Sequence, residues 1–273
     1  MDSATELRRY VPFVALERML RDRQLRLTRV DQFRDPFEGS VPKRQIDEQV
    51  AIFRSPNATR MMAESMVAQD PGTTLPRSPY RDPWAQIKMR RAVQTRSTHV
   101  SCWTAGPESE AIWRLYCEDG VSGQGVALCS TLGKVEASVA RHDLIVSPVT
   151  YRRYHEGPAF NDELDPFMHK RLGFKHECEV RLLSYNGPHY LVLGRALSGG
   201  DGDTPAAVLP PELPVHIFLD WNPLDIADAI TVSPYATEDY EQRVRAAVTA
   251  IDSGAADLIA LSVLSERRYG ALI

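Results

Sequence analysis

The chain has 273 residues with a formal net charge of −4, and 43% of the residues are hydrophobic. A chain of this length can bury a full core without disulfides or metals, and its acidic balance argues against non-specific binding along a nucleic-acid backbone. The four cysteines form no C-x-x-C pair, the N-terminus has no apolar signal region, and no apolar run is long enough to cross a membrane. We therefore expect a cytoplasmic protein.

Short strands and helices are predicted along the chain without a regular βαβ rhythm. Alternating or continuous apolar residues predict strands at 7–10, 25–28, 99–103, 126–130, 144–151, 174–185, 216–219, 229–232 and 258–264. Helical spacing of apolar residues predicts helices at 12–23, 108–117 and 240–251. This mixture favours an α+β fold over a doubly wound one.

Residues 40–98 are predicted to form a helical insertion in a single α+β domain that spans residues 1–273. Apolar residues recur at helical spacing on both sides of the Pro-rich stretch 71–83. A second stretch, rich in Gly, Pro and Asp, covers residues 196–214 and is predicted to be a loop. The sequence leaves open whether the insertion is a lid, a partner surface or neither.

One predicted strand carries three charged residues on the same face. Side chains alternate across a strand, so Glu177, Glu179 and Arg181 share one face, while Cys178 and Val180 belong to the apolar face. In one interpretation the charges are a solvated edge whose Glu–Arg pair contributes little. In the other, the two carboxylates line a cleft, where proximity raises the pKa of one and the arginine keeps the other ionised. Such a carboxylate acts as a base or stabilises a developing cation.

Polar and aromatic residues gather before and within the 108–117 helix. Ser101 and Trp103 share one face of their predicted strand, and Trp113 and Tyr116 lie three residues apart on one side of the helix. The aromatic residues either fill the core or form a flat wall for a ligand ring.

Three further features contain residue types that occur in binding sites. Arg8 and Arg9 on the first predicted strand are either a surface basic pair or an anchor for an anion. The glycine-rich stretch 120–125 has neither P-loop nor dinucleotide-binding spacing, so it is predicted to be a turn. His169 and His176 are too isolated to indicate a metal site, and none is predicted.

The order of these motifs resembles a bacterial family catalogued as domain of unknown function 2971. The resemblance rests on residues 7–10, 31–38, 101–103, 113–116, 125–128, 177–181, 230–235 and 262–265. It covers nearly the whole chain, with residues 40–98 and 196–214 as additions. Each motif is short, and their order is the specific part. The family name implies no activity.

A more distant similarity is to ADP-ribosyltransferases. These enzymes have an Arg or His on an early strand, a Ser-Thr-Ser strand, and a late strand with a catalytic Glu, often as Glu-x-Glu. Here Arg8 or Arg9 matches the first feature, and Ser101, in Ser-Cys-Trp, matches the second imperfectly. Glu177 and Glu179 match the third, with Glu179 as the catalytic residue. The similarity implies a split mixed β-sheet.

The same similarity implies NAD as the substrate, without a metal. Glu179, helped by Glu177 and Ser101, would stabilise the oxocarbenium-like centre that forms when the nicotinamide–ribose bond breaks. The residues implied to bind NAD by hydrogen bonds or ring stacking are Arg8, Arg9, Tyr10, Trp103, Trp113, Tyr116 and Arg181, of which Arg181 would also keep Glu179 charged.

The leading hypothesis is therefore an NAD-dependent ADP-ribosyltransferase-like enzyme in a toxin or phage-defence setting. Its acceptor would be a protein or a nucleic acid. The alternatives are a non-enzymatic module that binds a nucleotide or a protein, a metal-independent RNA-processing enzyme with Glu179 as base, and a plain interaction domain. Convergence of Arg8 or Arg9, Ser101 and Glu179 on one cleft would favour the enzyme.

Overall fold

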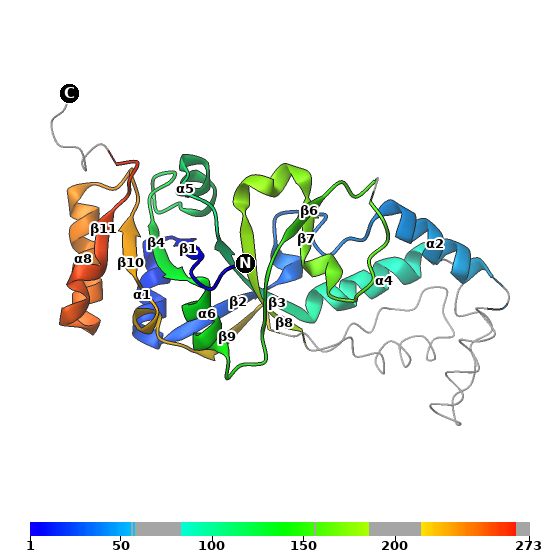
Figure 1. The fold of residues 1–273 in the computed structure, drawn as a ribbon, viewed down its shortest axis with the longest axis horizontal. Coiled ribbons are helices and arrows are strands. Elements are labelled where there is room, and N and C mark those ends of the chain that lie inside the picture. The colour runs from blue at the N-terminus through cyan, green and yellow to red at the C-terminus, as the bar shows by residue number, and fades with distance from the viewer. Residues whose placement is uncertain (56, 58–82, 156, 186–213, 266–273) are drawn as a thin grey trace.

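The structure is a computed structural model and describes residues 1–55, 57, 83–155, 157–185 and 214–265. Helices lie against one large sheet and beyond one of its ends (Figure 1), and the α+β class expected from the sequence is confirmed. Within the described ranges, no helix combines the length and apolar character that crossing a bilayer requires.

The large sheet has the strand order β11-β10-β4-β1-β3-β2-β9, with β8 paired to β3 and β5 paired to β8. Its strands are β1 (Glu6–Val11), β2 (Gln24–Arg29), β3 (Thr98–Thr104), β4 (Val126–Thr131), β5 (Ile145–Pro148), β8 (Glu179–Tyr185), β9 (His216–Asp220), β10 (Ala229–Val232) and β11 (Ile259–Leu261). All paired strands are antiparallel except β10 and β11, which are parallel. A separate parallel pair joins β6 (Thr150–Arg152) to β7 (His169–Arg171).

Two amphipathic helices cover the core at the β1–β4–β10 side of the sheet. The described α-helices are α1 (Phe13–Asp22), α2 (Lys43–Arg54), α4 (Pro83–Arg96), α5 (Glu110–Tyr116), α6 (Leu132–Val139) and α8 (Glu238–Ile251). Helix α1 buries Leu16 and Leu20, and α8 buries Tyr240 and Val244, in one apolar cluster with the strands. The spacing of four places each pair on one face of its helix. The Thr237 hydroxyl accepts from the Tyr240 amide and so caps α8.

The sheet forks at β3. Strand β8 pairs with β3 along its whole length on one side. On the other side, β2 pairs with β3 near its start, at Val100, and β1 pairs with it only at its end, at Thr104. The middle of β3, around Ser101, therefore has no paired strand on that side among the described residues, and a side chain from β1 or β2 can enter the space.

The strand expected at 174–185 begins only at Glu179. Residues 172–177 form the 3₁₀-helix η3 (Leu172–Glu177), and Cys178 follows in the left-handed region with a φ of 43°. The alternation that predicted a core-facing Cys178 therefore does not apply, and its side chain is exposed. Val180 is buried as expected. The predicted 144–151 strand is also divided, into β5 and β6.

Helices α2 and α4 lie side by side and extend away from the sheet at one end of the molecule (Figure 1). They fall within the segment predicted to be a helical insertion. Residues 58–82 of that segment lie outside the described residues, as does the predicted 196–214 loop except for Pro214.

Candidate functional site

A cavity of about 510 Å³ lies where the sheet forks, between β1, β2, β3, α5 and η3. Its lining includes Arg9, Tyr10, Ser101, Tyr116 and Glu177, all of them residues that the sequence singled out. The fold thus brings together side chains from four distant segments. The volume is within the range of about 300–1,000 Å³ that is usual for ligand pockets.

Arg9 crosses the fork from β1. Its Nη1 donates to the Ser101 hydroxyl at 2.5 Å, and its Nη2 donates to the Arg26 carbonyl oxygen at 3.1 Å. Its guanidinium lies 6.0 Å from the Trp103 ring centroid. Burial and then the nearby Arg26 charge lower the Arg9 pKa to about 10, so the group stays charged at neutral pH. No carboxylate pairs with Arg9 or Arg26 within the described part of the chain, which leaves two cations available to an anion.

A buried charge network lies behind the cavity, centred on Arg181. Its Nε donates to Glu179 Oε1 at 2.8 Å, and its Nη1 donates to Glu38 Oε1 at 2.6 Å and to the Phe167 carbonyl at 2.5 Å. Arg181, Glu179 and Glu38 are all buried. The interpretation as a solvated edge is wrong, because β8 is paired on both sides and its charges are covered.

Lys170 of β7 joins the two predicted carboxylates. Its ammonium lies 2.5 Å from Glu177 Oε2 and 2.7 Å from Glu179 Oε2. The contact is reached although Glu177 ends η3 and Glu179 begins β8. Glu177 lines the cavity, whereas Glu179 lies behind it between Lys170 and Arg181.

The network fixes the protonation states of its members. Burial alone would raise the pKa of Glu179, but the charges of Arg181 and Lys170 outweigh it and lower this pKa to about 2. Burial raises the pKa of the Cys102 thiol and of the Tyr116 phenol, and the neighbouring carboxylates add to both shifts. Cys102 and Tyr116 are therefore both neutral at ordinary pH.

The low pKa of Glu179 predicts a loss of stability in acid. Because this pKa is about 2 in the folded protein against an ordinary value of 4.5, the stabilisation is complete above about pH 4.5 and disappears as the pH falls towards 2. Its size is on the order of 3 kcal/mol. Urea unfolding of the wild type and Glu179→Gln from pH 7 to 2.5 should show the stability difference shrinking over that interval. A difference that stays constant down to pH 2.5 would contradict this assignment.

Five of the predicted residues do not line the cavity, and one of them is Glu179, which lies behind it as described above. Arg8 points to the other face of β1, where it pairs with Glu6 at 2.7 Å. Trp103 and Trp113 are buried in apolar clusters, so they fit the core interpretation rather than a ligand wall. Arg181 is completely buried in the network described above. Of the predicted aromatic wall, Tyr116 reaches the cavity.

Three residues with functional chemistry are not singled out by any sequence pattern. They are Glu38, Arg26 and Lys170. All three line the cavity. The one available signal was the alternation of β2, which places Arg26 opposite the buried Leu25 and Leu27.

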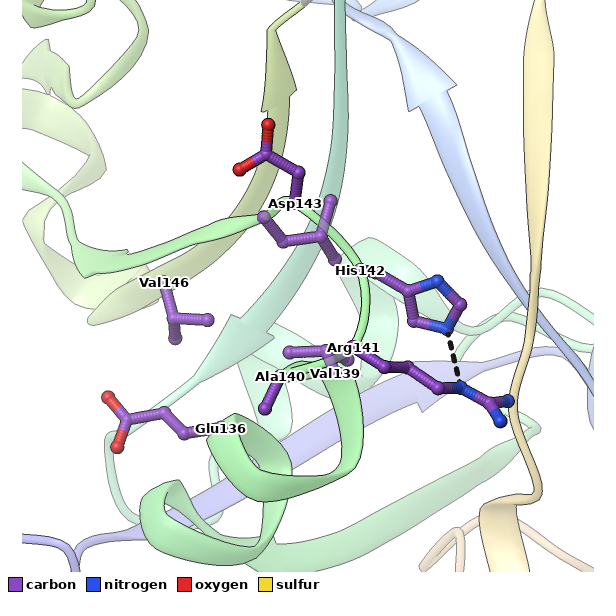
Figure 2. A pocket seen from close by; sticks show the side chains of 8 residues that line it. Glu136, Val139, Ala140, Arg141, His142, Asp143 and Val146 are labelled. Atoms are coloured by element: carbon purple, nitrogen blue, oxygen red, sulfur yellow. Dashed lines mark hydrogen bonds between the residues drawn. The ribbon is translucent and has the colours of Figure 1, made fainter.

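A second cavity, of about 550 Å³, lies beside the end of α6 and the start of β5 (Figure 2). The labelled Glu136, Arg141 and Asp143 side chains are exposed there, and Arg141 Nε donates to His142 Nε2 at 3.3 Å. None of the predicted site residues lines it. The cavity at the fork is therefore the stronger candidate.

Among the described residues, no group of three or more His, Cys, Asp or Glu side chains is arranged to hold a metal ion. Comparisons of the chain with protein-family models, with curated proteins and with solved structures found no match.

Proposed function

We propose that the cavity at the fork binds NAD and that the protein is an ADP-ribosyltransferase-like enzyme. The observation that carries this proposal is the meeting of Arg9, Ser101 and Glu177 in one cavity. They come from β1, from β3 and from η3 just before β8, in the chain order Arg, Ser, Glu of the ADP-ribosyltransferases, with Glu177 in place of the expected Glu179, which lies behind the cavity. The fork between β1 and β2 agrees with the split sheet that this similarity implies.

The charges around the cavity suit NAD. Arg9 and Arg26 supply two cations without carboxylate partners among the described residues. In the buried network centred on Arg181, the two cations Lys170 and Arg181 pair with three carboxylates, those of Glu38, Glu177 and Glu179. This network therefore carries one net negative charge. NAD carries an anionic diphosphate and a cationic nicotinamide riboside. We place the diphosphate beside the arginines and the riboside beside Glu177.

In the proposed reaction the bond between the nicotinamide nitrogen and the anomeric carbon of ribose breaks. Nicotinamide leaves with the bonding electron pair, and the positive charge that develops on the ribose is stabilised by the Glu177 carboxylate. An acceptor then gives an electron pair to the anomeric carbon and releases its proton to water. The acceptor is a protein or a nucleic acid, and when water reacts instead the products are ADP-ribose and nicotinamide.

Nicotinamide release tests the proposal without knowledge of the acceptor. Purified protein, with and without cell extract, is incubated with NAD labelled in the nicotinamide ring. We expect release by the wild type and a fall of about 100-fold in kcat/KM for Arg9→Lys, because lysine cannot make the paired hydrogen bonds of a guanidinium. Arg8→Lys is the matched control, since Arg8 does not line the cavity and pairs with Glu6 and the Gly106 carbonyl instead, and it should stay within about twofold of the wild type.

Two results would count against the enzyme. The proposal fails if the wild type releases no nicotinamide under either condition, or if Arg9→Lys releases it as fast as Arg8→Lys. NAD that raises the melting temperature without being cleaved would support the alternative of a nucleotide-binding module.

A further inference from the structure

Glu38 is the buried carboxylate of the network whose hydrogen bonding is incomplete. It follows β2 in the turn Asp35-Pro36-Phe37-Glu38, is 5% exposed and lines the cavity. Its Oε1 accepts from Arg181 Nη1 at 2.6 Å. Its Oε2 is buried and has no hydrogen-bond partner among the described residues. A buried carboxylate oxygen in that state is costly, and a ligand that donates to it would remove the cost.

Tyr10 repeats this pattern on β1. It is 8% exposed and lines the same cavity, and its hydroxyl likewise has no partner in the described ranges. Burial raises the pKa of Tyr10, so the phenol stays neutral and can donate or accept. Two residues that line the cavity therefore each carry a buried polar atom without a partner among the described residues, and the carboxylate oxygen of Glu38 can only accept.

The chemistry of Glu38 favours a hydroxyl as its partner. The Arg181 guanidinium already balances the Glu38 charge. A neutral donor is therefore enough to satisfy the hydrogen bonding of Oε2, and a second cation would add little electrostatic stabilisation. Arg9 and Arg26, which have no carboxylate partner in the part of the chain that the structure describes, line the same cavity and favour an anion nearby. A phosphorylated sugar provides both a hydroxyl donor for Glu38 and an anionic group for the two arginines.

We propose that Glu38 is a binding residue whose free oxygen accepts a hydrogen bond from a sugar hydroxyl of the ligand. This inference rests on the proposed function for the identity of that sugar as a ribose of NAD. It adds Glu38, from the turn that follows β2, to the ligand-binding residues Arg9, Ser101 and Glu177.

Asp35 provides a matched control three residues away. It lines the cavity too, but its Oδ1 already accepts from Arg171 Nη2 at 2.7 Å and from the Phe37 amide at 3.0 Å. Asp35→Asn and Glu38→Gln each remove one negative charge at nearly unchanged size. Glu38→Gln alone changes the oxygen that has no partner, because its carbonyl can keep the Arg181 contact while its NH₂ group takes the place of Oε2.

Binding is measured by calorimetry with two probes, ADP-ribose, which carries ribose hydroxyls, and inorganic pyrophosphate, which carries none. We expect Glu38→Gln to weaken ADP-ribose binding about tenfold or more and to leave pyrophosphate binding within about twofold. Asp35→Asn should leave both within about twofold. The inference fails if Glu38→Gln binds ADP-ribose like the wild type, if it weakens both probes equally, or if the wild type does not bind ADP-ribose.

Tyr10→Phe keeps the test valid if Glu38→Gln does not fold. It removes the other unpartnered atom without touching the Arg181 network, and it should weaken ADP-ribose binding about three- to tenfold while sparing pyrophosphate. The two proposals fail separately. If Glu38→Gln weakens ADP-ribose binding but the wild type releases no nicotinamide, only the proposed enzyme activity is contradicted. If the wild type releases nicotinamide but Glu38→Gln binds ADP-ribose like the wild type, only this inference is contradicted.

Discussion

Replacing Arg181 with methionine is expected to lower the free energy of unfolding by about 3–5 kcal/mol at neutral pH. Arg181 is fully buried, and its guanidinium balances Glu179 at 2.8 Å and Glu38 at 2.6 Å. Methionine fills similar space but leaves Glu38 without its charged partner and Glu179 with Lys170 alone. Urea unfolding monitored by circular dichroism gives the difference directly.

Arg245→Met on α8 is the control for this measurement. Arg245 also pairs with a glutamate, Glu241 at 3.3 Å, but its side chain is 38% exposed. An exposed pair of this kind contributes about 1 kcal/mol or less. Equal losses in the two variants would show that the Arg181 network does not hold the fold together.

Glu177→Gln is expected to lower nicotinamide release about 100-fold or more. The substitution keeps the size of the side chain and removes the charge that faces the cavity. Stability should change little, because Lys170 keeps its contact with Glu179 at 2.7 Å. Steady-state kinetics with labelled NAD, together with urea unfolding of the same preparation, separate the two effects.

Glu179→Gln should show the reverse pattern, a marked loss of stability with a smaller loss of rate. Its carboxylate lies behind the cavity and binds Arg181 and Lys170. If Glu179→Gln abolishes nicotinamide release while Glu177→Gln stays active, the assignment of Glu177 as the catalytic carboxylate is wrong. The assignment of Glu179, made from the sequence alone, is then right.

The sequence predicted most of the strands and the apolar helix faces, because these depend on local periodicity. It also singled out five residues that line the cavity, but it could not choose between Arg8 and Arg9. That choice depends on which side chain of β1 reaches the unpaired stretch of β3 beside Ser101, and the pairing of β3 with β1 at Thr104 and with β2 at Val100 sets it. No pattern within residues 6–11 carries that information.

The charged network could not be predicted, because its partners come from segments with no shared local pattern. Lys170 lies on a strand of three residues, and Glu38 lies in a turn. The left-handed Cys178 interrupted an otherwise convincing alternation and moved Glu177 into a 3₁₀-helix. Such a conformation is costly for a residue other than glycine, and surrounding tertiary contacts are what maintain it.

The most direct test of the central claim is a structure of the protein soaked with NAD. The account predicts NAD in the cavity at the fork, with its diphosphate against Arg9 and Arg26 and its nicotinamide riboside beside Glu177. It would be contradicted by NAD in the cavity next to α6 (Figure 2), or by an empty fork at an NAD concentration that saturates binding in solution.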